Sequence, residues 1–209
     1  MNPSIQSNAD RLAAAAAITA KARQSITEAD DLAAEVSKLK LAAAGGDLDD
    51  RGAAELVRLS EAARMADITA PRRARILADS EAAEVKVGLE VLAALSDALA
   101  PVEADAAAAA DLLTAALVDP AAAALEADIV LARELGVARC WVEKAMPGVY
   151  GASVLREKVD NGLRTSWGSS HVPATAREIV ASFDTELAAI RSGTAMLKSI
   201  LKAAQKARD

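Results

Sequence analysis

Alanine dominates this chain and sets the strongest limit on its fold. Of the 209 residues, 54 are Ala and only four are aromatic. Ala has the highest intrinsic helix propensity, whereas strands favour β-branched and aromatic residues. A buried Ala removes little more than one methyl group from water, so it contributes less stability than a buried Leu or Ile. We therefore expect an all-α protein that relies on long helices and on packing against partner chains.

Both ends of the chain carry long segments with apolar residues at helical spacing. The first segment is expected to form a helix from about residue 7 to residue 44, because Gly45 and Gly46 end it. Its inward positions are Ile5, Leu12, Ala15, Thr19, Ala22, Ile26, Ala29, Ala33 and Val36. The last segment, from about 174 to 207, has the cleanest heptad pattern in the chain. Its inward positions are Ala176, Val180, Phe183, Leu187, Ile190, Thr194, Leu197, Leu201 and Ala204. These patterns predict coiled-coil-like N- and C-terminal helices, each packed against a long helix of the same chain or of another subunit.

Prolines mark the expected helix boundaries in the middle of the chain. Pro71, Pro101 and Pro120 lack a backbone N–H and are favoured in the first turn of a helix. The expected helices are about 47–67, 71–99, 101–118 and 120–135. Alternatively, Pro101 or Pro120 would kink a longer helix. Within the helix 71–99, the expected buried stripe is Ile76, Ala83, Val87, Val91, Ala94, Leu95 and Ala98. The short connection at Gly45-Gly46 predicts an antiparallel hairpin, so the expected fold is an elongated helical bundle with long antiparallel hairpin helices.

Composition divides the chain into three regions. Residues 1–136 are Ala-rich and are expected to form a helical hairpin and bundle. Residues 137–173 hold four glycines, two prolines and three of the four aromatic residues, so we expect an irregular junction with short helices. Residues 174–209 form the heptad-patterned helix. No repeat of fixed period accompanies this division.

The residue types that carry most enzyme chemistry are scarce here. His171 is the only histidine and Cys140 the only cysteine, so a histidine-rich or thiolate metal site within the chain is not expected. No glycine-rich phosphate loop or dinucleotide-binding fingerprint occurs. We therefore expect no catalytic residues, no metal and no cofactor, and we interpret the protein as not an enzyme.

Charge is segregated along the chain. Residues 79–134 contain twelve acidic residues and two basic ones, which predicts a solvated acidic face or a docking surface for a basic partner. Arg72, Arg73 and Arg75 follow Pro71 and would stand in the first turn of the expected helix 71–99, where cations oppose the helix dipole. Such a cluster is either solvated or paired with acidic residues of its own chain, such as Asp47, Asp49 and Asp50, or it is a candidate contact for an anionic partner. Nucleic acid is disfavoured, because the net charge is −6 and no aromatic residues interleave with the arginines.

The aromatic residues are the second candidate contact set. Trp141, Tyr150, Trp167 and Phe183 all lie within 43 consecutive residues. Aromatic side chains anchor both cores and interfaces. This cluster is therefore either the filling of a junction between helices or a surface that binds a partner.

These features favour a non-catalytic structural or assembly protein that acts through helix–helix packing, as a homo-oligomer or within a larger particle. A bacteriophage virion or capsid-accessory component would fit that description. The alternative is a helical binding module, either for nucleic acid through Arg72, Arg73 and Arg75 or for an apolar or lipid surface. No transmembrane segment is expected, and the apolar stretch 12–20 lacks the basic leader of a secretion signal. The expected location is the cytoplasm or the interior of a particle.

Overall fold

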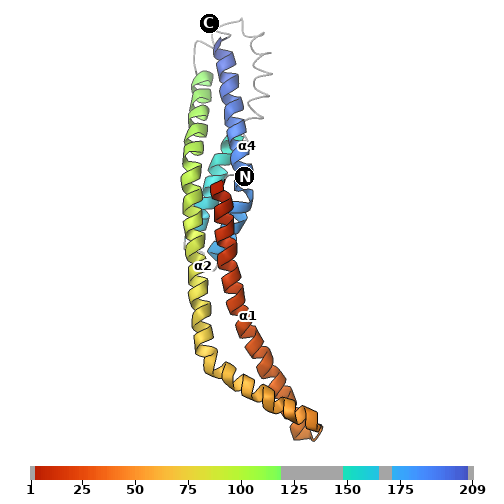
Figure 1. Ribbon diagram of the computed structural model, residues 1–209. Helices are drawn as coiled ribbons and strands as arrows, with labels where there is room; N and C mark the ends of the chain where they lie inside the picture. Colours follow the sequence, from red (N-terminus) through yellow and green to blue (C-terminus); the bar gives the residue numbers. More distant parts are fainter. Residues whose placement is uncertain (1–2, 119–147, 165–170, 207–209) are drawn as a thin grey trace. The chain divides into compact units, whose positions relative to one another are not determined.

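The computed structural model describes residues 3–118, 148–164 and 171–206, and no strand occurs among them. The chain forms helices α1 (Pro3–Gly45), α2 (Asp50–Val118) and α4 (Val172–Lys206), with a further helical segment at 148–163 (Figure 1). The prediction of an all-α helical bundle is confirmed. The expected first and last helices also match α1 and α4 to within a few residues.

The chain splits into two compact units. The hairpin unit comprises Asp10–Val87, and the bundle unit comprises Met1–Ala9 with Gly88–Asp209. The division falls inside α2, because this one helix contributes to both units. The boundary between the two units, after Val87, therefore does not coincide with any of the three regions that composition distinguishes.

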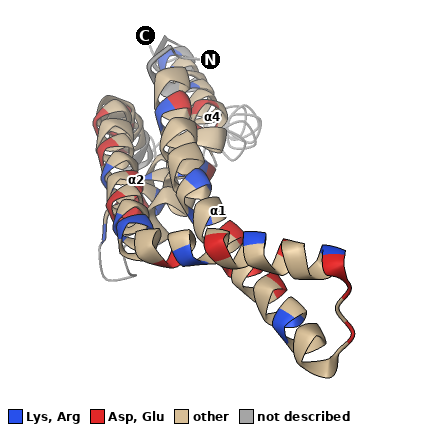
Figure 2. Ribbon diagram, turned by 60° about the horizontal axis from the view of Figure 1, so that its bottom comes forward, with Lys and Arg blue, Asp and Glu red and all other residues tan. Residues whose placement is uncertain are grey.

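A tight turn closes the hairpin unit. Gly46 has a φ of 79°, the left-handed conformation that glycine adopts without steric penalty. The N–H groups of Gly46 and Asp47 donate to the last carbonyls of α1, those of Ala43 and Ala42, at 3.2 and 3.0 Å. Asp49 then caps α2, because its Oδ1 accepts from the N–H of Gly52 at 2.7 Å. Figure 2 shows this turn at the end of the hairpin, where acidic residues gather.

The two helices of the hairpin unit approach each other closely. The Thr19 hydroxyl, only 1% exposed, donates to the backbone carbonyl of Ser80 at 3.3 Å, so the side chains between these backbones are small. Arg23 of α1 pairs with Glu81 of α2 at 2.8 Å. The buried residues of α1 in this unit are Leu12, Thr19, Ala22 and Val36. These four positions belong to the predicted stripe, whereas Ala33, also predicted to face inward, is exposed.

α2 runs without interruption through Pro71 and Pro101, so the boundary predicted at Pro71 is wrong, and at Pro101 the chain adopts the alternative of one longer helix. A proline inside a helix removes one hydrogen bond and costs about 3 kcal/mol. At Pro101 the missing hydrogen bond lies on the exposed side of α2. Pro101 is exposed, and so is Asp97, whose carbonyl loses its partner. The buried stripe continues on both sides of this proline as Leu92, Leu95, Leu99, Val102, Ala106 and Ala109. Burial of this stripe holds the helix together through the proline.

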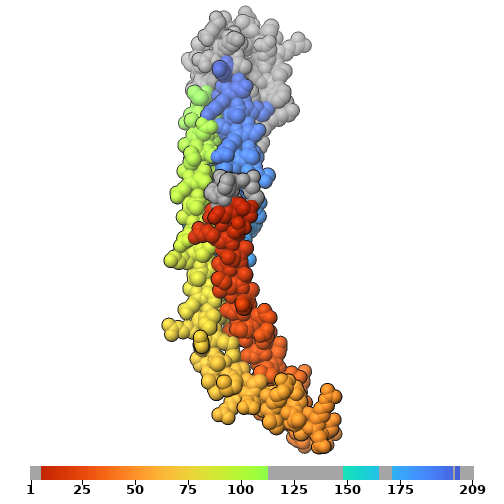
Figure 3. Space-filling model, viewed as in Figure 1, coloured from red at the N-terminus to blue at the C-terminus, as the bar shows by residue number. Residues whose placement is uncertain are grey.

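The bundle unit is built from α2, α4 and the segment 148–163. The inward stripe predicted for the last helix is confirmed from Ala176 to Leu197, since each of its seven positions in that range is at most 4% exposed. The three helical pieces meet at very short distances: a Cβ built on Gly162 would lie 2.9 Å from Leu92 of α2 and 3.3 Å from Thr175 of α4. Figure 3 shows α2 in green against α4 in blue along this unit. Small residues therefore set how closely these helices pack.

Part of the predicted junction 137–173 lies outside the described residues. Within its described portion, residues 148–163 form one regular helix, and α4 begins at Val172 with Pro173 in its first turn. The short helix predicted around 153–165 corresponds to this longer segment. The predicted helix at 120–135 and the expected break at Pro120 lie outside the described residues.

Candidate association surface

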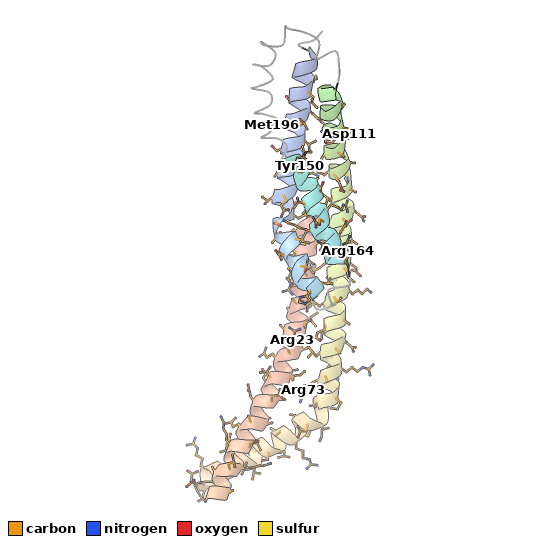
Figure 4. All side chains as sticks on the ribbon, turned by 180° about the vertical axis from the view of Figure 1, so that it is seen from behind. Arg23, Arg73, Asp111, Tyr150, Arg164 and Met196 are labelled. Carbon is orange, nitrogen blue, oxygen red and sulfur yellow. The ribbon has the colours of Figure 1, made fainter. Side chains whose placement is uncertain are left out.

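Within the hairpin unit, α2 changes direction, and Pro71 provides the physical reason. Figure 1 shows this bend in the yellow part of α2, and Figure 4 places Arg73 beside it. Pro71 has no N–H to donate to the carbonyl of Asp67, and its ring crowds that carbonyl. The hydroxyl of Thr69 donates to the carbonyls of Met65 and Ala66 at 3.0 and 3.1 Å. Side chains thus bond to the carbonyls of the turn that precedes the break.

Two of the arginines after Pro71 contact groups of their own helix, which agrees with the intramolecular alternative, although the partners are not Asp47, Asp49 or Asp50. Arg73 donates through Nη2 to the carbonyl of Ala66 and through Nη1 to the hydroxyl of Thr69, both at 2.6 Å. Arg75 lies 3.9 Å from Asp79, one turn ahead, in an exposed pair. The expectation that these cations oppose a helix dipole is wrong, because α2 begins at Asp50 and no helix starts at Pro71. An anionic partner is therefore not needed to explain them, although Arg72 is exposed.

Large apolar side chains lie exposed on the surface of the hairpin unit. Val57, Met65, Ile68 and Ile76 of α2 are 69%, 57%, 62% and 48% exposed. The predicted burial of Ile76 is wrong, because the face of α2 that packs in this unit carries Leu59, Ser80 and Glu84 instead. The sequence reasoning also missed the other three. The signal that would have found them is a second row of apolar residues at helical spacing along α2, on a different face from the buried row.

The four aromatic candidates do not form one described surface. Phe183 is fully buried in the bundle unit, so we assign it to the core. Tyr150 is 62% exposed on the segment 148–163, where Figure 4 labels it, and Val154 one turn further is 52% exposed. Trp141 and Trp167 lie outside the described residues. Among the aromatic candidates that the structure describes, Tyr150 is the one available to a partner.

Several residues of the acidic stretch are paired within their own unit. Arg156 donates through Nε to Glu103 at 2.8 Å and through Nη1 to the hydroxyl of Ser96 at 2.6 Å, which ties the segment 148–163 to α2. Lys198 of α4 pairs with Asp105 of α2. These contacts favour a structural interpretation of the acids involved. Sequence reasoning missed Arg156, because a single arginine carries no pattern that marks it as a contact between helices.

In two ion pairs that join different helices, the pKa of one member is shifted, that of Arg23 and that of Glu186. The hydrogen bond to Glu81 raises the pKa of Arg23, with the charge of Glu84 adding to the effect. Burial raises the pKa of Glu186, but hydrogen bonds from Ser182 and Lys158 outweigh burial and leave this pKa below its usual value. Neither shift places a titration near neutral pH. Both pairs therefore act as contacts between helices.

The described residues bring together no group of three His, Cys, Asp or Glu side chains that would hold a metal ion. His171 is exposed directly before α4, and Cys140 lies outside the described part of the chain. None of the described helices has an apolar run long enough to cross a bilayer. Comparisons with known protein families, with curated proteins and with solved structures found no match to this chain.

Proposed function

We propose that this protein is a non-catalytic assembly protein that acts through helix–helix association, and that copies of the chain are its first partners. The observation that carries the proposal is the exposure of Val57, Met65, Ile68 and Ile76 on α2 of the hairpin unit. Several large apolar side chains exposed along one helix are typical of an interaction site. A bacteriophage virion or capsid-accessory component would use this kind of association.

The energetic argument rests on the thin core of the hairpin unit. Its buried seam consists largely of small or polar side chains, among them Thr19, Ala22, Ser80 and Glu84. Fully burying a Val, Leu, Ile or Met side chain contributes roughly 1.5–3 kcal/mol. The four exposed residues of α2 contribute little of this free energy while they face solvent. Burial against a partner would add it to the stability of the complex.

Sedimentation velocity of the full chain and of a Met65→Gln, Ile68→Gln double variant tests this proposal. Both positions are more than half exposed, so the variant is expected to keep its helical content by circular dichroism. We expect the wild-type chain to sediment as an oligomer and the variant to dissociate at the same concentration. Replacing Leu112, equally exposed but in the bundle unit, with Gln provides the control. A wild-type chain that sediments as a monomer throughout would refute the proposal.

A second candidate function, binding to an apolar or lipid surface, relies on the same exposed side chains. An amphipathic helix binds a membrane surface through its apolar face, with basic residues beside the lipid headgroups. Arg64 and Arg72 are exposed on the same helix. Co-sedimentation of the chain with anionic liposomes would favour this function, particularly if the Met65→Gln, Ile68→Gln variant stays in the supernatant.

A further inference from the structure

The exposed apolar residues of α2 form a single stripe with two charged residues at fixed places in it. The stripe runs Val57, Glu61, Met65, Ile68, Arg72 and Ile76, and all six residues are exposed. Successive members are separated by three or four residues, the spacing that keeps side chains on one face of an α-helix. The stripe lies roughly a third of a turn around α2 from the face that carries Leu59, Ser80 and Glu84. Its middle part, from Glu61 to Arg72, is therefore separate from the seam of the hairpin, whereas Ile76 lies one turn before Ser80 and borders the seam.

The order of apolar and charged residues along this stripe is the same from either end, except that the two charged residues have opposite signs. From either end the order is apolar, charged, apolar, and the two charged positions have opposite signs, Glu61 and Arg72. An antiparallel copy laid against the stripe places Val57 opposite Ile76, Glu61 opposite Arg72 and Met65 opposite Ile68. A two-fold interface requires this kind of self-complementarity, since each contact occurs twice.

We propose that two copies of this chain pair through this stripe of α2, antiparallel and about a two-fold axis that passes between Ala66 and Asp67. The inference rests on the proposed function and specifies its surface and register. The parallel arrangement is disfavoured, because it would set Glu61 against Glu61 and Arg72 against Arg72, and like charges facing each other oppose association. In the antiparallel register both charge contacts are attractive.

The bend of α2 affects which contacts contribute most to the affinity of the pairing. Met65 and Ile68 flank the proposed axis, so their contact depends least on the angle at which two bent helices cross. Val57 and Ile76 stand furthest from the axis, so their contact depends most on that angle. We therefore expect Met65 and Ile68 to supply most of the affinity, while Glu61 and Arg72 set orientation and register.

Complementary charge reversals test the register directly. Glu61→Arg turns both charge contacts of a homodimer into Arg–Arg contacts, and Arg72→Glu turns both into Glu–Glu contacts. Each single variant is expected to dimerise about tenfold or more weakly than the wild-type chain. A mixture of the two variants restores both attractive contacts, so a heterodimer is expected with affinity close to that of the wild-type chain. The double variant Glu61→Arg, Arg72→Glu should also recover homodimers.

Native mass spectrometry separates these species, because the two single variants differ in mass. Asp67→Arg is the matched control: it makes the same charge change as Glu61→Arg at an exposed position of the same helix, about 120° around it. This control is expected to dimerise like the wild-type chain, and circular dichroism should show unchanged helicity in all variants.

The outcomes distinguish this inference from the proposed function. Single variants that dimerise weakly on their own but form a tight heterodimer when mixed support the register. Single variants that dimerise as tightly as the wild-type chain, or that stay dissociated when mixed, overturn the register while leaving association by another surface intact. A wild-type chain that never dimerises would overturn the proposed function as well.

Discussion

Replacing Gly148 with Ala is expected to destabilise the bundle unit, whereas the same change at Gly151 is expected to be tolerated. Both glycines lie on the helical segment 148–163 and face α4. A Cβ on Gly148 would lie 2.8 Å from the carbonyl oxygen of Ala189 and 3.0 Å from the Cα of Gly193. These neighbours are backbone atoms, so relief of the clash requires the helices to move apart. At Gly151 the nearest atom is Cγ1 of the Ile190 side chain, at 3.3 Å.

The expected magnitude follows from two opposing effects. Gly→Ala inside a helix stabilises by roughly 0.5–1 kcal/mol, because Ala loses less conformational entropy on folding. Forcing extra volume into a packed contact costs typically 1–3 kcal/mol. Because the atoms nearest to Gly148 are all backbone atoms of α4, we place this cost toward the upper end and expect a net loss of about 1–2 kcal/mol. At Gly151 the side chain of Ile190 adjusts by a few tenths of an ångström, so the net change is expected to be about zero or slightly stabilising.

Urea denaturation followed by circular dichroism measures both changes. For a chain of this size, a loss of 1–2 kcal/mol corresponds to a fall of about 2–8 °C in the thermal midpoint. The reasoning would be refuted if Gly148→Ala were as stable as the wild-type protein, because the segment 148–163 would then not approach α4 at the stated distance. Equal destabilisation by both substitutions would show that backbone and side-chain neighbours do not differ as argued.

Four further substitutions probe other parts of the fold. Leu187→Ala and Leu197→Ala, at the buried stripe of α4, should each lower the free energy of unfolding by about 2–5 kcal/mol, and a negligible loss in both would contradict the assignment of that stripe. Pro71→Ala restores the N–H that the carbonyl of Asp67 lacks, so thermal unfolding should show a stabilisation of about 1–3 kcal/mol; a destabilised variant would mean that the bend itself is required. Glu186→Gln should reduce stability near neutral pH, because the lowered pKa of Glu186 gives a contribution present above its ordinary value of 4.5 and lost as pH falls through the folded-state pKa. A stability difference that persists in urea titrations well below that pH would contradict this pairing.

The heptad of the last helix could be predicted from sequence because large apolar residues define its inward face. Phe183, Leu187, Ile190 and Leu197 leave a single orientation that buries them all, and the structure adopts it. α1 was less predictable. Four of its nine predicted inward positions are Ala, whose small side chain distinguishes weakly between facing inward and facing outward, and the prediction for Ala33 is wrong.

The predicted helix boundary at Pro71 is wrong, and the helix continues through Pro101 as well, because local propensity alone does not account for packing. A proline penalty of about 3 kcal/mol is smaller than the gain from an unbroken apolar stripe such as the one from Leu92 to Ala109. The predicted burial of Ile76 is wrong for the same reason. Apolar spacing alone does not indicate that the polar residues Ser80 and Glu84 occupy the buried face. The hydrogen bonds of Arg156 join residues that lie 53 and 60 positions apart in the chain, so only folding brings them together, whereas those of Arg73 form because α2 continues through Pro71.

The solution mass of the full chain, measured by light scattering across a wide range of concentrations, tests the central claim most directly. The claim is that copies of this protein associate through helix faces that a single chain leaves exposed. Association of this kind predicts a discrete oligomer whose mass falls toward that of the monomer only on strong dilution. The mass of a single chain, 21.5 kDa, at every concentration would contradict it.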